Sequence, residues 1–263
     1  MSAVVAIDIG NTRAKFGIFQ PNATGFVEPH GIVARVLSQT NDLSIDFLRW
    51  WNSLDVAAVT RVVVAGSDPD LRDELIRRWP LKQHVPLVVS SFQQIPVRVD
   101  VDFPARVGID RLLNALAVAR LRESGRPAIV VDSGTATTVD LVTSDGAFRG
   151  GSILPGLRLS AHAMHDYTAR LPLVDVDETL TALPSLPGRN TEAAMLAGLF
   201  IGQLGAVREI SERLAEAARR DFHETQSAQL FITGGGGRQL ADHLADSAYV
   251  DSLALHGLAL LGI

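Results

Sequence analysis

Short apolar runs alternate with longer amphipathic segments along the chain, a pattern typical of a protein that mixes β-strands and α-helices. Val4–Ile7 predicts a first strand, and Phe16–Phe19 predicts its return as a hairpin. Val62–Gly66 predicts a buried strand, and Ser67–Pro69 then predicts a helix start, because a polar cap there precedes proline. Further strands are expected at 32–36, 87–89, 128–131, 137–142 and 230–233, a turn at 21–25, and helices at 42–51, 110–123, 191–220 and 253–261.

One of these patterns occurs twice. An apolar strand ends in Asp, Gly follows two residues later, and a polar turn then leads into a returning strand, first at Asp8 and again at Asp132. A repeat at this scale predicts two related halves. The boundary is expected near 124–127, which gives an N-terminal lobe of residues 1–124 and a C-terminal lobe of residues 125–263.

Composition narrows the function by exclusion. The net charge of -5 and the lack of a Lys/Arg-rich run argue against nucleic acid or an anionic membrane as the main partner. Because the chain has no cysteine, disulfides, thiolate zinc sites and a cysteine nucleophile are excluded, and a reducing, cytoplasmic location fits. The opening residues 1–10 are interpreted as a strand rather than a signal peptide, and no uninterrupted apolar run reaches membrane-spanning length.

The first polar turn carries groups suited to a phosphate. Gly10 lets the backbone approach a ligand, and the N–H groups of such a turn form an anion-binding concavity. Asn11 and Thr12 add side-chain donors, and Lys15 adds a positive charge. Asp8 at the strand end could hold a hydrated Mg²⁺ against phosphate oxygens. Taken alone, the motif is also compatible with an ordinary hairpin turn.

The second turn, Asp132–Thr138, repeats this chemistry with one Ser and three Thr hydroxyls behind a carboxylate. Two such turns facing each other across a cleft would bind a polyphosphate from both sides. Neither turn is a Walker loop, because the Gly-x-x-x-x-Gly-Lys-Ser/Thr pattern does not occur in the sequence. The run Gly234–Gly237 after a late strand either lets a backbone approach a flat ligand such as adenine or forms a flexible turn.

Asp110 stands at the start of an expected helix and has two interpretations. An acidic residue there is favoured electrostatically, so Asp110 can serve as a helix cap. It can also act as a general base that accepts a proton from a substrate hydroxyl, with Arg111 binding a substrate carboxylate through paired hydrogen bonds. These residues by themselves favour the cap.

Taken in order, these motifs resemble those of type III pantothenate kinases. The resemblance covers nearly the whole chain and lies in Asp8–Thr12, Val107–Arg111, Asp132–Thr138, Gly150–Gly156, Thr168–Pro172, Gly188–Thr191 and Thr233–Gly235. It implies a duplicated α/β fold of the actin-like (ribonuclease H-like) ATPase type, as in actin, Hsp70 and sugar kinases, and a homodimer. It also implies transfer of the ATP γ-phosphoryl group to the primary hydroxyl of pantothenate, the first committed step towards coenzyme A, with Mg²⁺ and a monovalent cation, K⁺ or NH₄⁺.

The resemblance also implies a role for individual residues. Asp110 would be the general base and Asp132 would ligate the monovalent cation, while the expected Mg²⁺ agrees with the position of Asp8 at its strand end. The implied ATP-binding residues are Asp8, Ile9, Gly10, Asn11, Thr12, Arg13, Ala14, Lys15 and Thr135. The implied pantothenate-binding residues are Val101, Gly108, Ile109, Asp110 and Arg111, with Thr191 reaching the substrate across the dimer interface.

Two alternatives to pantothenate phosphorylation stay open at this point. Family members usually have a Tyr shortly before the Pro that precedes Gly-x-Asp-Arg, where this chain has Val101, so the substrate could be another small hydroxy acid. A catalytically silent nucleotide-binding homologue is the second alternative, and the intact Asp8, Asp110 and Asp132 argue against it. Small residues also recur every fourth position along one expected helix, which permits close helix packing either between chains or within one; they are Ala194, Gly198, Gly202 and Ala206.

Overall fold

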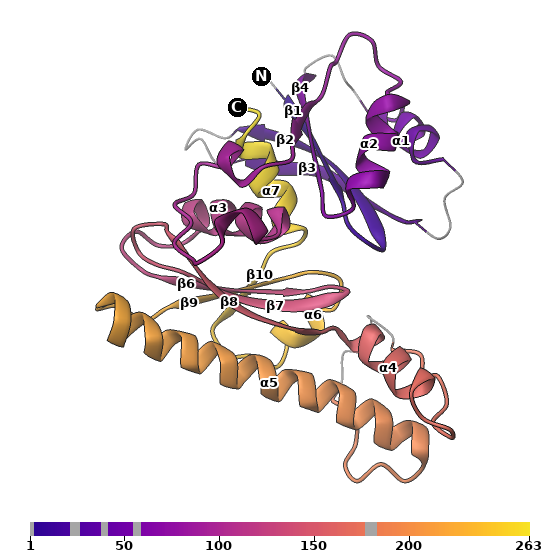
Figure 1. Cartoon of the computed structure of the whole chain (residues 1–263), viewed down its shortest axis with the longest axis vertical. Helices are drawn as coiled ribbons and strands as arrows, with labels where there is room; N and C mark the ends of the chain where they lie inside the picture. The colour runs from indigo at the N-terminus through magenta and orange to yellow at the C-terminus, as the bar shows by residue number, and fades with distance from the viewer. Residues whose placement is uncertain (1–2, 22–26, 38–41, 55–58, 177–182) are drawn as a thin grey trace. The chain divides into compact units, whose positions relative to one another are not determined.

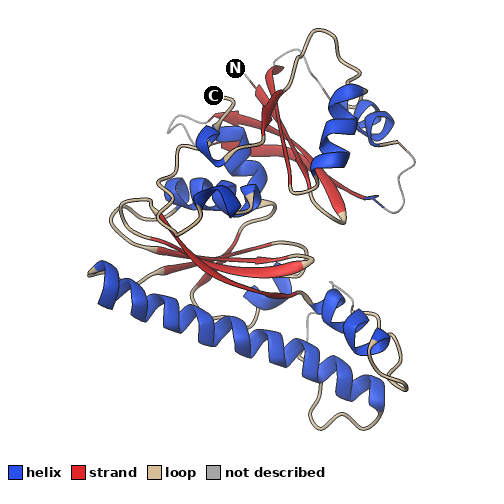
Figure 2. Cartoon of the chain, viewed as in Figure 1, coloured by secondary structure: helices blue, strands red, loops and turns tan. Residues whose placement is uncertain are grey.

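The computed structural model describes residues 3–21, 27–37, 42–54, 59–176 and 183–263. It divides into two compact units, Met1–Leu121 with Ser252–Ile263, and Arg122–Asp251. Each unit contains one five-stranded mixed sheet with helices beside it (Figures 1 and 2). Residues 22–25 of the expected turn lie outside the described residues.

The sheet of the first unit has the strand order β3-β2-β1-β4-β5. Its strands are β1 (Ala3–Ile9), β2 (Arg13–Pro21), β3 (Val27–Val36), β4 (Val59–Gly66) and β5 (Leu87–Val89). β1 and β2 form the predicted antiparallel hairpin, β3 continues it, and β4 and β5 run parallel to β1 on the other side. All the strands expected from the apolar runs of this half are present, and β3 begins earlier than its apolar run.

Successive side chains of β1 point to opposite faces of the sheet, and they are buried on both faces. The sheet therefore needs helices to cover it. Its helices are α1 (Leu43–Trp51), α2 (Pro69–Arg77), α3 (Ile109–Leu121) and α7 (Leu253–Leu260), with short 3₁₀ helices at Phe92–Gln94 and Pro104–Arg106. α1 and α2 pack on the face that carries Val5 and Ile7, where Phe47 and Trp50 are buried. α7 packs against β1 and α3.

The second unit repeats the first. Its strands are β6 (Ala128–Ser133), β7 (Ala136–Val142), β8 (Phe148–Pro155), β9 (Gln229–Thr233) and β10 (Ser247–Tyr249), in the order β10-β9-β6-β7-β8. β6, β7 and β8 pair antiparallel, and β6, β9 and β10 pair parallel, so order and directions match those of the first sheet strand for strand. The predicted duplicated α/β fold is therefore confirmed.

The helices of the second unit are α4 (Leu157–Asp166), α5 (Thr191–Phe222) and α6 (Gly237–Ala241). α5 begins at Asn190, whose side chain accepts a hydrogen bond from the Ala193 N–H, and it ends at His223 in a left-handed conformation. By length and hydropathy alone α5 could cross a membrane, but one of its sides packs against β6 and β7. Core helices of soluble proteins meet the same two criteria, so these two properties do not indicate a membrane span.

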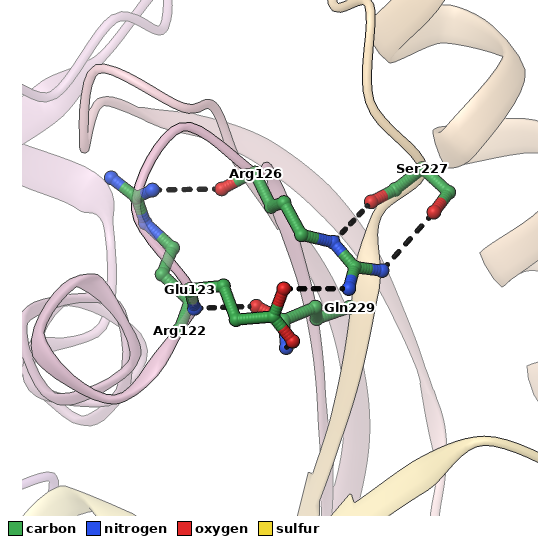
Figure 3. Close-up of polar contacts among 5 residues, drawn as sticks. All are labelled: Arg122, Glu123, Arg126, Ser227 and Gln229. Atoms are coloured by element: carbon green, nitrogen blue, oxygen red, sulfur yellow. Dashed lines mark hydrogen bonds and ion pairs between the residues drawn. The ribbon is translucent and has the colours of Figure 1, made fainter.

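The segment after α3 is fastened within the second unit, as Figure 3 shows. The Arg126 guanidinium donates to the backbone oxygen and the hydroxyl of Ser227, and Glu123 exchanges hydrogen bonds with Gln229. Arg122 donates to the backbone oxygens of Arg126 and Ser144. The second unit thus begins at residue 122, and residues 252–263, which the sequence placed in the second lobe, group with the first unit.

Candidate functional site

The first polar turn joins β1 to β2 in the first unit. Asp8 lies opposite Lys15 and Ile9 opposite Ala14, and the Gly10 N–H donates to the Arg13 backbone oxygen at 2.9 Å. Between these two points the side chains of Asn11 and Thr12 are exposed. The predicted phosphate-binding residues 8–15 therefore form one continuous turn with its tip open to ligands.

The end of β4 supports this turn from the side. The N–H of Ser67 donates to the Ile9 backbone oxygen at 2.9 Å. A Cβ at Gly66 would lie 2.8 Å from that same oxygen, so only glycine allows the two strand ends to approach this closely. Thr12 is held on the other side, where its backbone oxygen accepts from the Leu37 N–H at 2.9 Å.

The second turn joins β6 to β7 in the second unit and has the same plan. Asp132 lies opposite Thr138, Ser133 lies opposite Thr137, and the Gly134 N–H donates to the Ala136 backbone oxygen at 3.0 Å. Ser133 and Thr137 are buried, whereas residues 134–136 are exposed. A buried base thus carries an open tip, which contains Thr135.

Glycines from two other segments pack against the second turn. Gly234 has φ +90°, and a Cβ there would lie 2.6 Å from Asp132 Oδ1. A Cβ at Gly156, which follows β8, would lie 2.7 Å from the Thr135 backbone oxygen. The Gly236 N–H donates to the Ser133 backbone oxygen at 3.0 Å. The glycine run after β9 is therefore packed against the turn that contains Asp132.

An arginine and a tyrosine that the sequence did not single out lie beside this glycine run. The guanidinium carbon of Arg238 lies 4.5 Å from the centre of the Tyr249 ring. Burial raises the pKa of the Tyr249 hydroxyl, and the negative charges of Asp251 and Asp132 raise it too, while Arg238 lowers it. A Cβ at Gly237 would lie 3.4 Å from the Tyr249 ring, so this pair is next to the glycine run that packs against the second turn. A lone Arg and a lone Tyr carry no sequence pattern that could have indicated this.

The segment that contains the predicted base is in the first unit, where Asp110 is the second residue of α3. Asp110 Oδ1 accepts a hydrogen bond from the Arg111 N–H at 2.9 Å. A Cβ at Gly108 would collide with the same carboxylate oxygen, so glycine gives this side chain its position. The structure brings residues 108–111 together in one short stretch, and Val101 lies half-buried in the segment before it.

The last predicted site residue, Thr191, lies apart from the segment around Asp110 in the chain and begins α5 in the second unit. It is exposed, directly after the capping Asn190. Gly188 lies against the backbone of Ala194 in the first turn of the helix, where a Cβ would collide. The run Gly188–Thr191 therefore has a structural reason of its own, which is the tight entry into α5.

The candidate metal ligands are single carboxylates and not clusters. Within the described ranges no three His, Cys, Asp or Glu side chains come together as a metal cluster. Mg²⁺ usually keeps several waters and binds one or two carboxylates together with phosphate oxygens, so a single aspartate in a phosphate-binding turn fits it. Asp8 meets that description, and Asp132 offers a carboxylate among hydroxyl and carbonyl oxygens, the ligand type that a monovalent cation takes.

Comparison with known proteins identifies a family and relatives of this chain. A family model described as type III pantothenate kinase matches residues 4–213. The chain is 37% identical to the type III pantothenate kinase of Roseobacter denitrificans over 268 residues. The aligned region covers 98% of this chain and 96% of that protein. It is 36% identical over 216 residues to the type III pantothenate kinase of Moorella thermoacetica, at 80% and 81% coverage.

A solved structure agrees at the level of the fold. A putative Baf family transcriptional activator from Campylobacter jejuni superposes with a TM-score of 0.61 at 19% identity, over 98% of this chain and 96% of that one. Two sheets of identical topology, each with an Asp-x-Gly turn after its central strand, define a protein of the actin-like ATPase class. Within that class, the chain belongs to the type III pantothenate kinase family, so the predicted family and the predicted enzyme class, a phosphotransferase, are both confirmed.

Proposed function

We propose that the protein transfers the γ-phosphoryl group of ATP to the primary hydroxyl of pantothenate, giving 4′-phosphopantothenate for coenzyme A synthesis in the cytoplasm. The observation that carries this proposal is the pair of Asp-x-Gly turns at equivalent strand positions of the two units. Membership of a pantothenate kinase family supports the acceptor. Phosphoryl transfer requires positioning and charge neutralisation more than covalent chemistry, and both turns supply backbone and hydroxyl donors for that purpose.

Each turn supplies its own donors for the phosphates of ATP in this proposal. In the first turn the donors are the exposed residues Asn11 and Thr12, with Lys15 adding positive charge. In the second turn Thr135 is the exposed hydroxyl at the tip. The remaining ATP-binding residues, Asp8, Ile9, Gly10, Arg13 and Ala14, form the frame of the first turn.

Asp110 accepts the proton of the pantothenate hydroxyl as the phosphoryl group is transferred. Its carboxylate is half-buried and is held by the Arg111 N–H on one side and by the close packing of Gly108 on the other. Arg111 binds the carboxylate of pantothenate, and Gly108, Ile109 and Val101 line the pocket. The hydrogen bond from the Arg111 N–H also satisfies a donor in the first turn of α3, so in this proposal Asp110 supports the helix start as well as acting as the base.

Two cations complete the charge balance. Mg²⁺ neutralises the phosphate oxygens when bound, and Asp8 is the residue that holds it. A monovalent cation, K⁺ or NH₄⁺, binds at Asp132. Depletion of K⁺ and NH₄⁺ should lower activity of the natural protein and should have little further effect on Asp132→Ala. Equal activity of the natural protein with and without these ions would exclude the monovalent site.

The protein acts as a homodimer in this proposal, with Thr191 reaching the pantothenate of its partner. Support comes from the exposed face of α5, where a Cβ added at Gly198, Gly202 or Gly205 would meet nothing within 4 Å. Gly198→Leu should block close helix packing and convert dimers to monomers in sedimentation. Arg219→Leu, an exposed change in the last turn of the same helix, is the control that should leave the dimer intact.

The decisive experiment replaces the base. Asp110→Asn keeps the size of the side chain but removes the proton acceptor, so kcat should fall about 10²- to 10⁴-fold while nucleotide still binds. Asp102→Asn removes an exposed carboxylate from the same segment and should leave kcat unchanged. A near-normal kcat for Asp110→Asn would show that Asp110 is not the base.

Val101 favours one second candidate, a kinase of the same fold for another small hydroxy acid. An aliphatic, half-buried side chain stands where family members usually carry a tyrosine. Phosphorylation rates across a panel of hydroxy acids distinguish the two candidates. A much higher kcat/KM for an acid other than pantothenate would favour the second one, and Val101→Tyr should then shift the preference towards pantothenate.

A further inference from the structure

A buried glutamine lies under the second turn. Gln203 is in the middle of α5, on the side of the helix that packs against β6 and β7, and only 7% of its surface is exposed. Its neighbours along the buried face of α5 include the apolar Phe200, Leu204 and Val207. A polar amide in such a position is costly unless it forms hydrogen bonds.

The amide of Gln203 reaches both residues that close the turn. Its Nε2 donates to Thr137 Oγ1 at 2.5 Å and to Ser133 Oγ at 3.4 Å. Ser133 and Thr137 lie opposite each other in the β6–β7 pair, at the last register position before the tip. One side chain of α5 therefore connects the two strand ends from below, while residues 134–136 face outwards.

The connection continues to the glycine run. A Cβ at Gly236 would lie 2.8 Å from Ser133 Oγ, and the Gly236 N–H donates to the backbone oxygen of Ser133. Ser133 is thus held by α5 through its side chain and by the segment after β9 through its backbone. A substitution at Gln203 would therefore directly remove the hydrogen bonds to Ser133 and Thr137.

The second polar atom of the amide points to a use beyond packing. Gln203 Oε1 is buried and forms no hydrogen bond among the described residues. A buried acceptor without a hydrogen-bond partner costs stability, so packing alone does not account for an amide at this position. The two donor contacts of Nε2 to the turn are the favourable polar interactions that the glutamine makes here.

We infer that Gln203 is a positioning residue for ATP binding, which fixes the hydroxyls of Ser133 and Thr137 so that the exposed tip of the turn, residues 134–136, is held in place before the phosphates arrive. This inference rests on the proposed function, in which the second turn binds ATP. Donors that are already fixed bind a phosphate without the entropic cost of ordering the turn.

Gln203→Met tests the inference, because methionine keeps the length of the side chain and removes both hydrogen bonds. The KM for ATP should rise about tenfold, as the loss of one to two hydrogen bonds predicts. The KM for pantothenate should change less than about twofold. A purely structural role would lower stability and the active fraction, and so the apparent kcat, without raising the KM for ATP selectively.

Gln203→Glu keeps the shape of the side chain and supplies a second readout, should the methionine variant fold poorly. An ionised carboxyl group under the turn repels the phosphates, so affinity for ATP should fall as the pH rises through the pKa of the introduced group and recover at lower pH. The natural protein should lack this dependence. Ser211→Ala is the matched control, since Ser211 is also buried on α5 but has no described hydrogen bond.

A readout without nucleotide separates the inference from the proposed function. Amide hydrogen exchange of residues 133–137 should be faster in Gln203→Met than in Ser211→Ala, with no ATP present. If the natural protein neither bound nor used ATP, the proposed function would fail, and unchanged exchange would then overturn the positioning of the turn as well. An unaltered KM for ATP in both Gln203 variants would overturn the inference, whatever the exchange rates.

Discussion

Gly108 and Asp110 are in close contact, because the carboxylate oxygen Oδ1 of Asp110 lies where it would collide with a Cβ at Gly108. Only a residue without Cβ lets the carboxylate fold back over the start of α3 and accept the Arg111 N–H. The glycine in the Gly-x-Asp-Arg motif therefore determines where the carboxylate points.

Gly108→Ala should accordingly reduce catalysis more than stability. The atom that must move is the end of a flexible side chain, so the fold can adapt, but the carboxylate rotates away from its position. We expect kcat to fall about 10-fold to 10²-fold, since displacements near 1 Å at a reacting group have effects of that size. The measurement is steady-state kinetics beside thermal unfolding, with the exposed Ala105→Ser as control. Unchanged kcat would contradict the positional role of Gly108.

Gly156→Ala should disturb the second turn through its backbone. A Cβ there would collide with the backbone oxygen of Gly134 and lie 2.7 Å from that of Thr135. Backbone cannot yield as a side chain can, so we expect a loss of about 1–3 kcal/mol in the free energy of unfolding and weaker ATP binding. Denaturant titration and nucleotide titration measure the two effects. Gly31→Ala, where a Cβ meets nothing within 4 Å, should change neither.

Tyr249 should titrate at higher pH than an ordinary tyrosine. Burial is the main cause that raises the pKa of its phenol. The charges of Asp251 and Asp132 raise this pKa further, and Arg238 lowers it. The chain has two tyrosines, so in Tyr167→Phe the absorbance of tyrosinate reports Tyr249 alone. The midpoint should lie above about 10, the usual value.

The charge of Arg238 can be tested in the same titration. Arg238→Gln removes a cation that lowers the pKa of Tyr249, so the midpoint should move further up, whereas Arg238→Lys should largely keep it. Because the raised pKa favours the protonated folded form, this tyrosine stabilises the protein below the unfolded pKa and the stabilisation is lost as pH rises through the folded pKa. A midpoint that falls in Arg238→Gln would contradict the assigned cause.

Asn190→Ala should weaken the start of α5. The side chain of Asn190 accepts the Ala193 N–H at 2.8 Å, one of the donors that a helix start leaves without a partner. The free energy of unfolding should fall by about 1 kcal/mol, and Asn190→Ser, which keeps an acceptor, should recover most of it. Denaturant titration of the two variants checks this, and equal losses in both would show that the cap is not the cause.

The sequence predicted the parts of the fold that local chemistry controls. The hairpin at Asp8, its repeat at Asp132 and the helix cap at Asp68 are each encoded within a few residues, and each is present. The elements β8, α4, α6 and β10 were not predicted. β8 contains Gly151, which ordinarily indicates a turn, but here a glycine is needed because a Cβ would lie 2.5 Å from Asp140 Oδ1 on the neighbouring strand.

In the candidate site, too, the sequence predicted the local features but not the contacts between distant segments. The turns could be found from their glycines and hydroxyls, because these residues follow one another in the chain. The support from Gln203 could not, because this residue approaches the turn from α5 and carries no local pattern. Gly156 lies in a stretch that only the family resemblance indicated, and its contact with the turn could not be predicted from the sequence. Val101 differs from the usual family pattern, and no property of the residue itself indicates a role.

The return of α7 to the first unit has a consequence for how this protein is made. Leu253, Leu255 and Leu258 fill the interior beside β1 and α3, which are synthesised more than a hundred residues earlier. During translation the sheet of the first unit therefore lacks α7 until the last residues are synthesised. The second unit, residues 122–251, is contiguous in the chain and does not need these last residues. We therefore expect the second unit to complete its folding before the first, although it is synthesised later. Until then the apolar side of the first sheet is exposed and could bind chaperones.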